Sequence, residues 1–143
     1  MVRLRSGIPV VIVLTVALFG SIVGATETKP AVPTSKNKCP VCGMFVAKYP
    51  DWLTQIAFRD GTVFFFDGAK DMFKFYFNIK RYSPGRRADD ITAIYVTDYY
   101  SLLPIDGFTA AYVTGSDVYG PMGREMIPFA RKEEAGEFKK DHK

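Results

Sequence analysis

The hydrophobic and polar pattern of the chain first predicts a β-hairpin. Residues 52–58 and 63–66 are rich in aromatic and β-branched side chains, which favour strands. Between them stands Arg59-Asp60-Gly61-Thr62, and an Asp-Gly pair flanked by such runs is a strong short-range hairpin signal. We therefore expect two antiparallel strands joined by a tight turn.

A helix and a third strand are predicted to follow. Asp67 stands where a helix N-cap belongs, and apolar residues then recur at helical spacing at Ala69, Met72, Phe73 and Tyr76. Residues 83–87, Ser-Pro-Gly-Arg-Arg, form a loop, and residues 91–97 are apolar on both alternating faces, as in a buried strand. The predicted order is strand, strand, helix, strand.

The second part of the folded region partly repeats this order. Strands are predicted at residues 109–114 and 126–129, with a turn-rich loop at 116–123 between them and a helix at 131–140. Phe66 and Phe75 are nine residues apart, and so are Phe129 and Phe138. The matched spacing indicates a repeat whose second copy lacks its last strand. We expect an α+β fold of two small strand-strand-helix-strand units packed together, at about 38–98 and 107–143.

The N-terminal pattern is typical of an export signal. Arg3 and Arg5 precede an apolar run at residues 8–19, and small residues at 23–25 suit a signal peptidase. We expect a signal peptide at residues 1–25 and a mature chain from Thr26 in the periplasm or cell envelope. The alternative is an uncleaved membrane anchor, since residues 7–25 are just long enough to span a bilayer. The apolar run is not followed by a cysteine, so an N-terminal lipid-modified cysteine is not expected.

Residues 26–37 contain Pro30 and Pro33 but no aromatic residue, which predicts a flexible linker before a folded domain at 38–143.

Composition narrows the possible classes of function. The chain of 143 residues has 19 basic and 15 acidic side chains, too small an excess of positive charge for a nucleic-acid partner. Its one histidine, His142, excludes a His-rich zinc site and argues against a Ser-His-Asp hydrolase.

The motif Cys39-Pro40-Val41-Cys42-Gly43-Met44 carries the strongest chemical signal. A disulfide suits an exported protein. A thioredoxin-like redox pair would follow a strand and open a helix, yet a strand-like run follows here. A zinc site would be half complete, because a second cysteine pair is missing. A Cu(I) site would gain Met44, since thiolate and thioether together select that ion. The residues alone leave these four interpretations open.

The remaining methionines differ in their surroundings. Met72 falls on the apolar face of the predicted helix and Met126 alternates in a predicted strand, so both suit the core. Met122 lies in the loop sequence Gly120-Pro121-Met122-Gly123, where packing gives no reason for a methionine. A thioether in a loop is available to a soft metal ion, although a chance surface methionine is an equally simple explanation.

The ordered series of motifs resembles the NosL family, the copper-binding accessory proteins of nitrous oxide reductase assembly. The resemblance runs from about Cys39 to Phe138. The matching stretches are Cys42-Gly43-Met44, Gln55-Ile56, Asp60-Gly61, Phe66-Asp67, Tyr95-Val96-Thr97-Asp98, Ala111-Tyr112-Val113, Gly115-Ser116, Gly120-Pro121-Met122-Gly123 and Pro128-Phe129. Two features depart from the family: the lipoprotein cysteine is missing, and the C-terminal end is short.

This resemblance implies a fold like the corresponding domain of organomercurial lyase. It also implies an exported, non-enzymatic protein that binds Cu(I) and hands it to apo-nitrous oxide reductase or another cuproenzyme client, helped by a membrane transporter complex. The family's cysteine falls on Cys42 and its loop methionine on Met122, and Met44 belongs to the same motif as Cys42. Cys39 is either a further sulfur ligand or a disulfide partner of Cys42. The alternative function is a thiol-disulfide or organometal-handling protein that uses Cys39 and Cys42.

Overall fold

The computed structural model describes residues 29–142, so the expected signal peptide at 1–25 lies outside the described residues. The helices among them are α1 (Ala69–Phe77), α2 (Ile79–Tyr82) and α3 (Lys132–Asp141), with short 3-10 turns at Val46–Lys48, Pro50–Trp52 and Ala88–Asp90. The strands are β1 (Thr54–Phe58), β2 (Val63–Phe66), β3 (Ile91–Thr97), β4 (Pro104–Asp106), β5 (Ala111–Val113), β6 (Tyr119–Gly120), β7 (Gly123–Arg124) and β8 (Ile127–Phe129). None of the helices described is long and apolar enough to cross a membrane.

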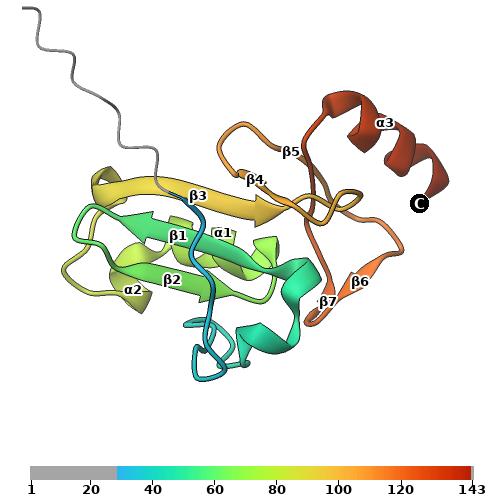
Figure 1. Ribbon diagram of the computed structural model, residues 1–143. Coiled ribbons are helices and arrows are strands. Elements are labelled where there is room, and N and C mark those ends of the chain that lie inside the picture. Colours follow the sequence, from blue (N-terminus) through green and yellow to red (C-terminus); the bar gives the residue numbers. More distant parts are fainter. Residues whose placement is uncertain (1–28, 143) are drawn as a thin grey trace, which may run out of the picture.

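A four-stranded antiparallel sheet in the order β2-β1-β3-β4 forms the first unit. Figure 1 shows α1 and α2 behind this sheet, while the N-terminal segment, in blue, crosses its other face. The core between helix and sheet includes Ile56, Phe66, Met72 and Phe75, all fully buried. The predicted order of strand, strand, helix and strand is confirmed, and so is the core position of Met72.

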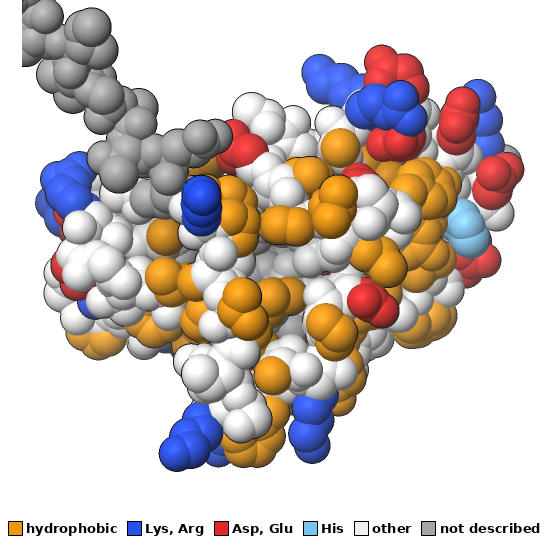
Figure 2. Space-filling view, viewed as in Figure 1, with side chains coloured by type: hydrophobic (Ala, Val, Ile, Leu, Met, Phe, Trp, Pro, Cys, Tyr) orange, Lys and Arg blue, Asp and Glu red, His pale blue; other side chains and the backbone are white. Residues whose placement is uncertain are grey.

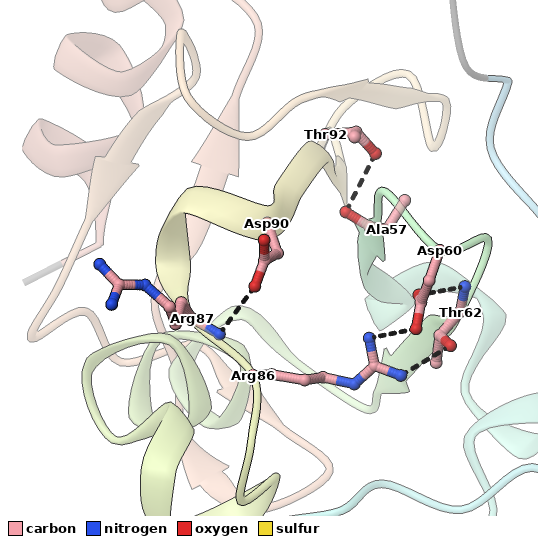
Figure 3. A network of polar contacts seen from close by, with 7 residues as sticks. All are labelled: Ala57, Asp60, Thr62, Arg86, Arg87, Asp90 and Thr92. Carbon is pink, nitrogen blue, oxygen red and sulfur yellow. Dashed lines mark hydrogen bonds and ion pairs between the residues drawn. The ribbon is translucent and has the colours of Figure 1, made fainter.

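A polar network fixes the end of the sheet at the β1–β2 turn (Figure 3). Gly61 has a φ of +82°, the left-handed conformation that glycine adopts without strain. Arg86 forms an ion pair of 2.8 Å with Asp60 and donates a hydrogen bond of 2.8 Å to Thr62 Oγ1. The Thr62 N–H donates to Asp60 at 3.0 Å. These contacts tie the predicted Asp-Gly turn to the loop before β3.

The second unit consists of the β5–β8 pair and α3, packed on its own core. Phe129 and Phe138 are both fully buried, with ring centroids 5.0 Å apart. The corresponding rings of Phe66 and Phe75 in the first unit lie 5.2 Å apart. The matched spacing seen in the sequence therefore marks two equivalent strand–helix contacts. Charged side chains gather over α3, at the upper right of Figure 2, because only Ala135 and Phe138 of that helix are buried.

Several local predictions need correction. Trp52 lies in a 3-10 turn, and the strand starts at Thr54, because Pro50 sets the geometry of that turn. The β6–β7 hairpin falls mainly in the segment predicted as a loop, and strand β4 falls in a segment for which no element is predicted. Each of these strands spans only two or three residues, too few to show a period. Met126 is half-buried rather than a core residue. The predicted N-cap Asp67 is also wrong: α1 begins at Ala69, with Gly68 as its N-cap.

The described part of the expected linker, residues 29–37, packs against the fold. The Ala31 N–H donates to Gln55 Oε1 at 2.8 Å, and Gln55 Nε2 donates back to Ala31 O at 3.2 Å. Ala31 also contacts the first core. Within residues 29–37, Ala31 is therefore held against the first unit of the fold. The carboxamide of Gln55 supplies the hydrogen bonds that the composition of the segment did not suggest.

Candidate metal site

The two cysteines lie in a preorganised turn at residues 39–44. The Cys39 N–H donates to Met44 O at 2.8 Å, and the Gly43 N–H donates to Cys39 O at 2.9 Å. Gly43 adopts a φ of +80°, so a side chain there would be strained. A bridge between Lys38 and Phe45 closes the base of the turn. The sequence therefore folds locally into a rigid loop that holds both thiols.

Main-chain N–H groups of this turn point at the sulfur atoms. Those of Val41 and Cys42 hydrogen-bond to the Cys39 sulfur, and that of Met44 hydrogen-bonds to the Cys42 sulfur. Such donors stabilise a thiolate, because they place partial positive charge against it. Both cysteines are free thiols in the structure, Cys39 buried and Cys42 half-buried. The turn is thus built to receive negative charge on sulfur.

Two buried carboxylates complete the cluster. Asp67 follows β2 and Asp71 lies in the first turn of α1, and they are only 1% and 6% exposed. The Cys42 thiol donates to Asp67 at 3.1 Å, and the Cys39 thiol lies 3.7 Å from Asp71 Oδ2. One donor atom from each of the four residues falls within 4.8 Å of all the others. This arrangement is able to hold a metal ion.

Burial keeps the two thiols protonated at neutral pH in the absence of a metal ion. It raises the pKa of Cys39 to about 11, against the opposing hydrogen bonds from the Cys42 and Val41 main chain. It also raises the pKa of Cys42 strongly, and hydrogen bonding to Asp67 adds to this increase. A thiolate is the form that binds metal ions, so each thiol that becomes a ligand must release its proton.

The loop that carries Met122 is fastened to the start of α1. Lys70 Nζ donates to Met122 O at 2.8 Å and to Arg124 O at 2.7 Å. Glu125, only 4% exposed, accepts a hydrogen bond from the Lys70 N–H. The Glu125 carboxylate lies so close to Gly68 that a Cβ there would be 2.3 Å from its Oε2. The β6–β7 hairpin is therefore tied to the helix turn that bears Asp71.

The structure brings the predicted sulfur residues together to different degrees. Cys39 and Cys42 share one cluster, and the main chain of Met44 is part of the same turn. Met122 belongs to the hairpin tied to Lys70, and its side chain is 45% exposed. Their roles as metal ligands remain predictions. His142 lies elsewhere, 2.9 Å from Asp117.

Sequence reasoning missed the two aspartates. Asp67 was interpreted as an N-cap, and Asp71 was not considered. Asp71 lies in the first turn of α1, whereas Asp67 precedes the helix, so a helical period does not link the two residues. Their approach to the cysteine turn depends on how β2 and α1 pack against residues 39–44.

Fold and site together define a small α+β protein with a preformed, thiol-rich cluster suited to a metal ion. The sequence profile of the NosL family matches residues 30–143, so the chain belongs to the NosL family. It is also similar in structure to the crystal structure of the copper chaperone NosL from Shewanella denitrificans. The TM-score is 0.66 at 22% sequence identity, over 80% of this chain and 87% of that one, which shows a shared fold. A search of curated proteins gave no match.

Proposed function

We propose that this protein is an exported, non-enzymatic Cu(I) carrier that supplies copper for the assembly of a cuproenzyme. The observation that carries this proposal is the cysteine turn. Two free thiols converge there, and three main-chain N–H groups already point at their sulfur atoms. Cu(I) prefers soft thiolate and thioether ligands, so this turn suits it. Membership in the NosL family and the likeness to a copper chaperone support the same reading.

The proposed ligands are Cys42 and Cys39, with Met44 and Met122 as thioether donors. Thiolates supply most of the affinity, because a neutral thioether donates more weakly. Met122 is exposed and lies in a hairpin that Lys70 ties to the start of α1, the helix that carries Asp71. A ligand at the surface of the site is easily exchanged for a ligand of the partner, which is what a carrier requires.

The geometry favours a carrier over a thiol-disulfide catalyst. Catalytic CxxC cysteines have a lowered pKa, usually at a helix N-terminus, because the thiolate is the nucleophile. Here the pKa of each thiol is raised by burial, and the turn leads through Phe45 into a short 3-10 turn. These protonated thiols still suit metal binding, because the bound ion displaces their protons.

The proposed location is the periplasm or cell envelope. The basic start, apolar run and small residues of segment 1–25 motivate it. The intact mass of the protein from the periplasmic fraction should correspond to a chain that begins at Thr26. A full-length species held in the membrane would show that the segment is an anchor.

The proposed client is apo-nitrous oxide reductase, with a membrane transporter complex assisting the transfer. This assignment follows from the resemblance to the NosL family. It is tested by mixing the Cu(I)-loaded protein with the apo-enzyme and measuring copper in each after separation. If apo-nitrous oxide reductase takes up no copper from the carrier but another apo-cuproenzyme does, the client is that other protein.

Copper binding itself is tested by anaerobic competition against a coloured Cu(I) chelator. The parent protein should bind one Cu(I), and Cys42→Ser should abolish that binding because the principal thiolate is lost. Cys39→Ser tests whether Cys39 is a Cu(I) ligand or a disulfide partner of Cys42. Unchanged affinity in that variant would show that Cys39 is not a ligand. A parent protein that fails to compete for Cu(I) would overturn the proposed function.

A further inference from the structure

Positive charge is concentrated in one stretch of the chain. Residues 72–88 contain five Lys and Arg side chains and lack an acidic one. Of the 19 basic side chains in the whole sequence, 14 therefore lie elsewhere, against 15 acidic ones. The excess positive charge belongs to the second half of α1, to α2 and to the loop before β3. A patch of a single sign attracts a surface of the opposite charge.

The residues of this stretch surround one hollow in the molecular surface. The hollow has a volume of about 590 Å³ and is lined by residues 76–81 and 86–89. Asp89 is the acidic member of the lining, and it pairs with Arg87 at 3.0 Å. Both side chains of that pair are more than 70% exposed, where an ion pair contributes little. The hollow therefore presents net positive charge to the solvent.

The cations of α1 and α2 are not neutralised by acidic neighbours. Within residues 29–142, the side chains of Lys74, Lys80 and Arg81 form no ion pair. All three side chains are exposed. By contrast, α3 interleaves three basic side chains with four acidic ones. The positive charge of α1 and α2 is thus available to an external partner, whereas that of α3 is balanced within the helix.

The two arginines of the loop before β3 differ in role. Figure 3 shows Arg86 directed into the β1–β2 turn, where it pairs with Asp60 at 2.8 Å, and Arg87 directed away from that turn. The Arg86 guanidinium also lies 4.8 Å from the ring centroid of Phe58. Arg86 therefore stabilises the fold, and Arg87 contributes its charge to the surface.

An exposed phenylalanine stands among these charges. Phe77, the last residue of α1, is 75% exposed. Its ring stacks on that of Phe73 with the centroids 6.0 Å apart, and Lys74 lies one turn earlier on the same helix face. A single exposed ring is common in proteins. An aromatic ring flanked by Lys and Arg on helical segments, however, is the pattern of helices that lie in a membrane interface.

We propose that one basic surface docks this protein on an anionic lipid bilayer. This basic surface consists of Lys74, Phe77, Lys80, Arg81 and Arg87. Its cations face the lipid phosphates, and the Phe77 ring enters the boundary between headgroups and acyl chains. The inference does not depend on Cu(I) binding, and it agrees with the envelope location of the proposed function.

A lipid surface suits the arrangement better than an acidic protein does. A specific protein interface fixes its charged groups by direct hydrogen bonds in a defined geometry. Lipid phosphates instead form a mobile array, which long Lys and Arg side chains meet without a fixed geometry. Cations that no neighbour holds in place, beside one protruding ring, match the second case.

Docking through the basic surface keeps the candidate metal site free. Asp71 lies in the first turn of α1 and Phe77 ends that helix, so the two positions are about 9 Å apart along its axis. Lys70 ties the hairpin of Met122 to the start of the same helix. The cysteine turn and the hairpin therefore lie toward one end of α1, and the basic surface lies toward the other.

Vesicle sedimentation tests the basic surface directly. The protein, as the cell processes it, is mixed with vesicles of phosphatidylcholine alone or with about one third phosphatidylglycerol. The parent should bind the anionic vesicles more strongly than the neutral ones. NaCl at about 1 M should reduce binding to the neutral level, because the Debye length falls to about 3 Å. Parent and variants carry the same N-terminus, so any contribution of that segment cancels in the comparison.

A matched pair of double variants tests the position of the charge. Lys80→Gln/Arg81→Gln should bind anionic vesicles about 25-fold more weakly, since each cation near such a surface contributes a factor of about five. Lys139→Gln/Lys140→Gln is the control, because this pair is also adjacent and exposed and follows a buried residue, Phe138. The control should bind within about threefold of the parent, because its charges lie outside the basic surface. Both variants should keep the Cu(I) affinity of the parent.

Substitutions of Phe77 test the contact of its ring with lipid. Phe77→Ala should bind anionic vesicles at least about fivefold more weakly, because less apolar surface enters the bilayer. Phe108→Ala, at a position 59% exposed in the β4–β5 turn, should bind as the parent does. The emission of Phe77→Trp should shift to shorter wavelength on anionic vesicles. The parent, whose one tryptophan is the half-buried Trp52, should show no such shift.

The outcomes separate this inference from the proposed function. Circular dichroism first establishes that each variant is folded. Equal binding of the parent to neutral and anionic vesicles overturns the inference, and so does a control lysine pair that matters as much as Lys80 and Arg81. Capture of soluble polyglutamate without binding to vesicles overturns it in favour of an acidic protein. Unshifted emission of Phe77→Trp overturns the entry of the ring. A parent that docks on anionic vesicles but does not bind Cu(I) supports the inference and contradicts the proposed carrier.

Discussion

The two strand–helix junctions, β2–α1 and β8–α3, share a framework but differ in chemistry. Each has a buried phenylalanine at the strand end, and each helix starts three residues later, at Ala69 and Lys132. Asp67 follows the first phenylalanine and is buried, whereas the exposed Ala130 follows the second. The phenylalanine contact therefore serves the fold in both units, and only the first unit places ionisable groups beside the thiols.

Each junction is also completed by a carboxylate from the other half of the molecule. Glu125, which precedes β8, accepts the Lys70 N–H at the start of α1. Asp98, which follows β3, accepts the Ala130 N–H at 2.7 Å, just before α3. Neither helix has a side-chain N-cap of its own. These crossed contacts bind the two units together and fix the first junction in place against the Met122 hairpin.

The largest expected effect comes from removing one phenylalanine from each junction. Phe66→Ala and Phe129→Ala should each lower the free energy of unfolding by about 3–5 kcal/mol, because a buried aromatic ring is lost. Phe66→Ala should also weaken Cu(I) binding by the folded protein, since Phe66 precedes Asp67 and supports α1. Urea unfolding and Cu(I) competition measure the two effects. Equal loss of Cu(I) affinity in both variants would contradict the division of roles.

Truncation of the crossed carboxylates should have a smaller effect on stability. Glu125→Ala and Asp98→Ala each remove the acceptor of part-buried main-chain N–H groups, which costs up to about 1–3 kcal/mol. Only Glu125→Ala should also reduce Cu(I) affinity, because Glu125 holds the hairpin of Met122 against α1. The same unfolding and competition measurements apply. Reduced affinity in Asp98→Ala alone would show that the second junction controls the site.

Met122→Leu tests the hairpin without disturbing the fold. The exchange keeps the size of the side chain and removes its sulfur, so stability should change by less than about 1.5 kcal/mol. Cu(I) affinity should fall about tenfold or more, in the range seen when a metal site loses a supporting group. Met72→Leu and Met126→Leu are controls that should retain the parent affinity. If all three variants bind Cu(I) alike, Met122 is not a ligand.

The smallest effect is the contribution of Asp98 to stability at low pH. Burial opposes ionisation of Asp98, but hydrogen bonds from Ser101 and Ala130 outweigh it, so its pKa lies below the ordinary value. A lowered pKa gives stability that is present above the unfolded value of about 3.9 and is lost as the pH falls through the folded value. Denaturant midpoints between pH 7 and pH 2 should fall less steeply in Asp98→Asn than in the parent. Asp51→Asn, at an exposed position, should follow the parent.

Local sequence predicted much of the first unit. The Asp60-Gly61 turn, the helix of Met72 and Phe75 and the third strand follow from short-range patterns, and the phenylalanine spacing revealed the second unit. The motif at residues 39–44 identified both thiols. The short strands β4, β6 and β7 were not predicted, because their pairing is decided by tertiary contacts rather than by a sequence period.

The carboxylates of the site could not be assigned from local pattern. An aspartate before a helix is usually an N-cap, and the sequence around Asp67 fits that pattern. In the fold, however, the Asp67 carboxylate accepts a hydrogen bond from the Cys42 thiol. Glu125 caps α1 from a position 55 residues further along the chain. Contacts at such separations depend on how the two units pack. The sequence therefore identified the sulfur-bearing residues of the candidate site, and the fold was needed to find the aspartates beside them.

X-ray absorption at the copper edge tests the central claim most directly. The Cu(I)-loaded protein should show a first shell made of sulfur, with the low coordination number that Cu(I) accepts. The double variant Asp67→Asn/Asp71→Asn should give the same shell, because the account assigns the copper ligands to sulfur. A parent shell of oxygen or nitrogen without sulfur would contradict the claim that the cysteine turn of the first unit binds Cu(I).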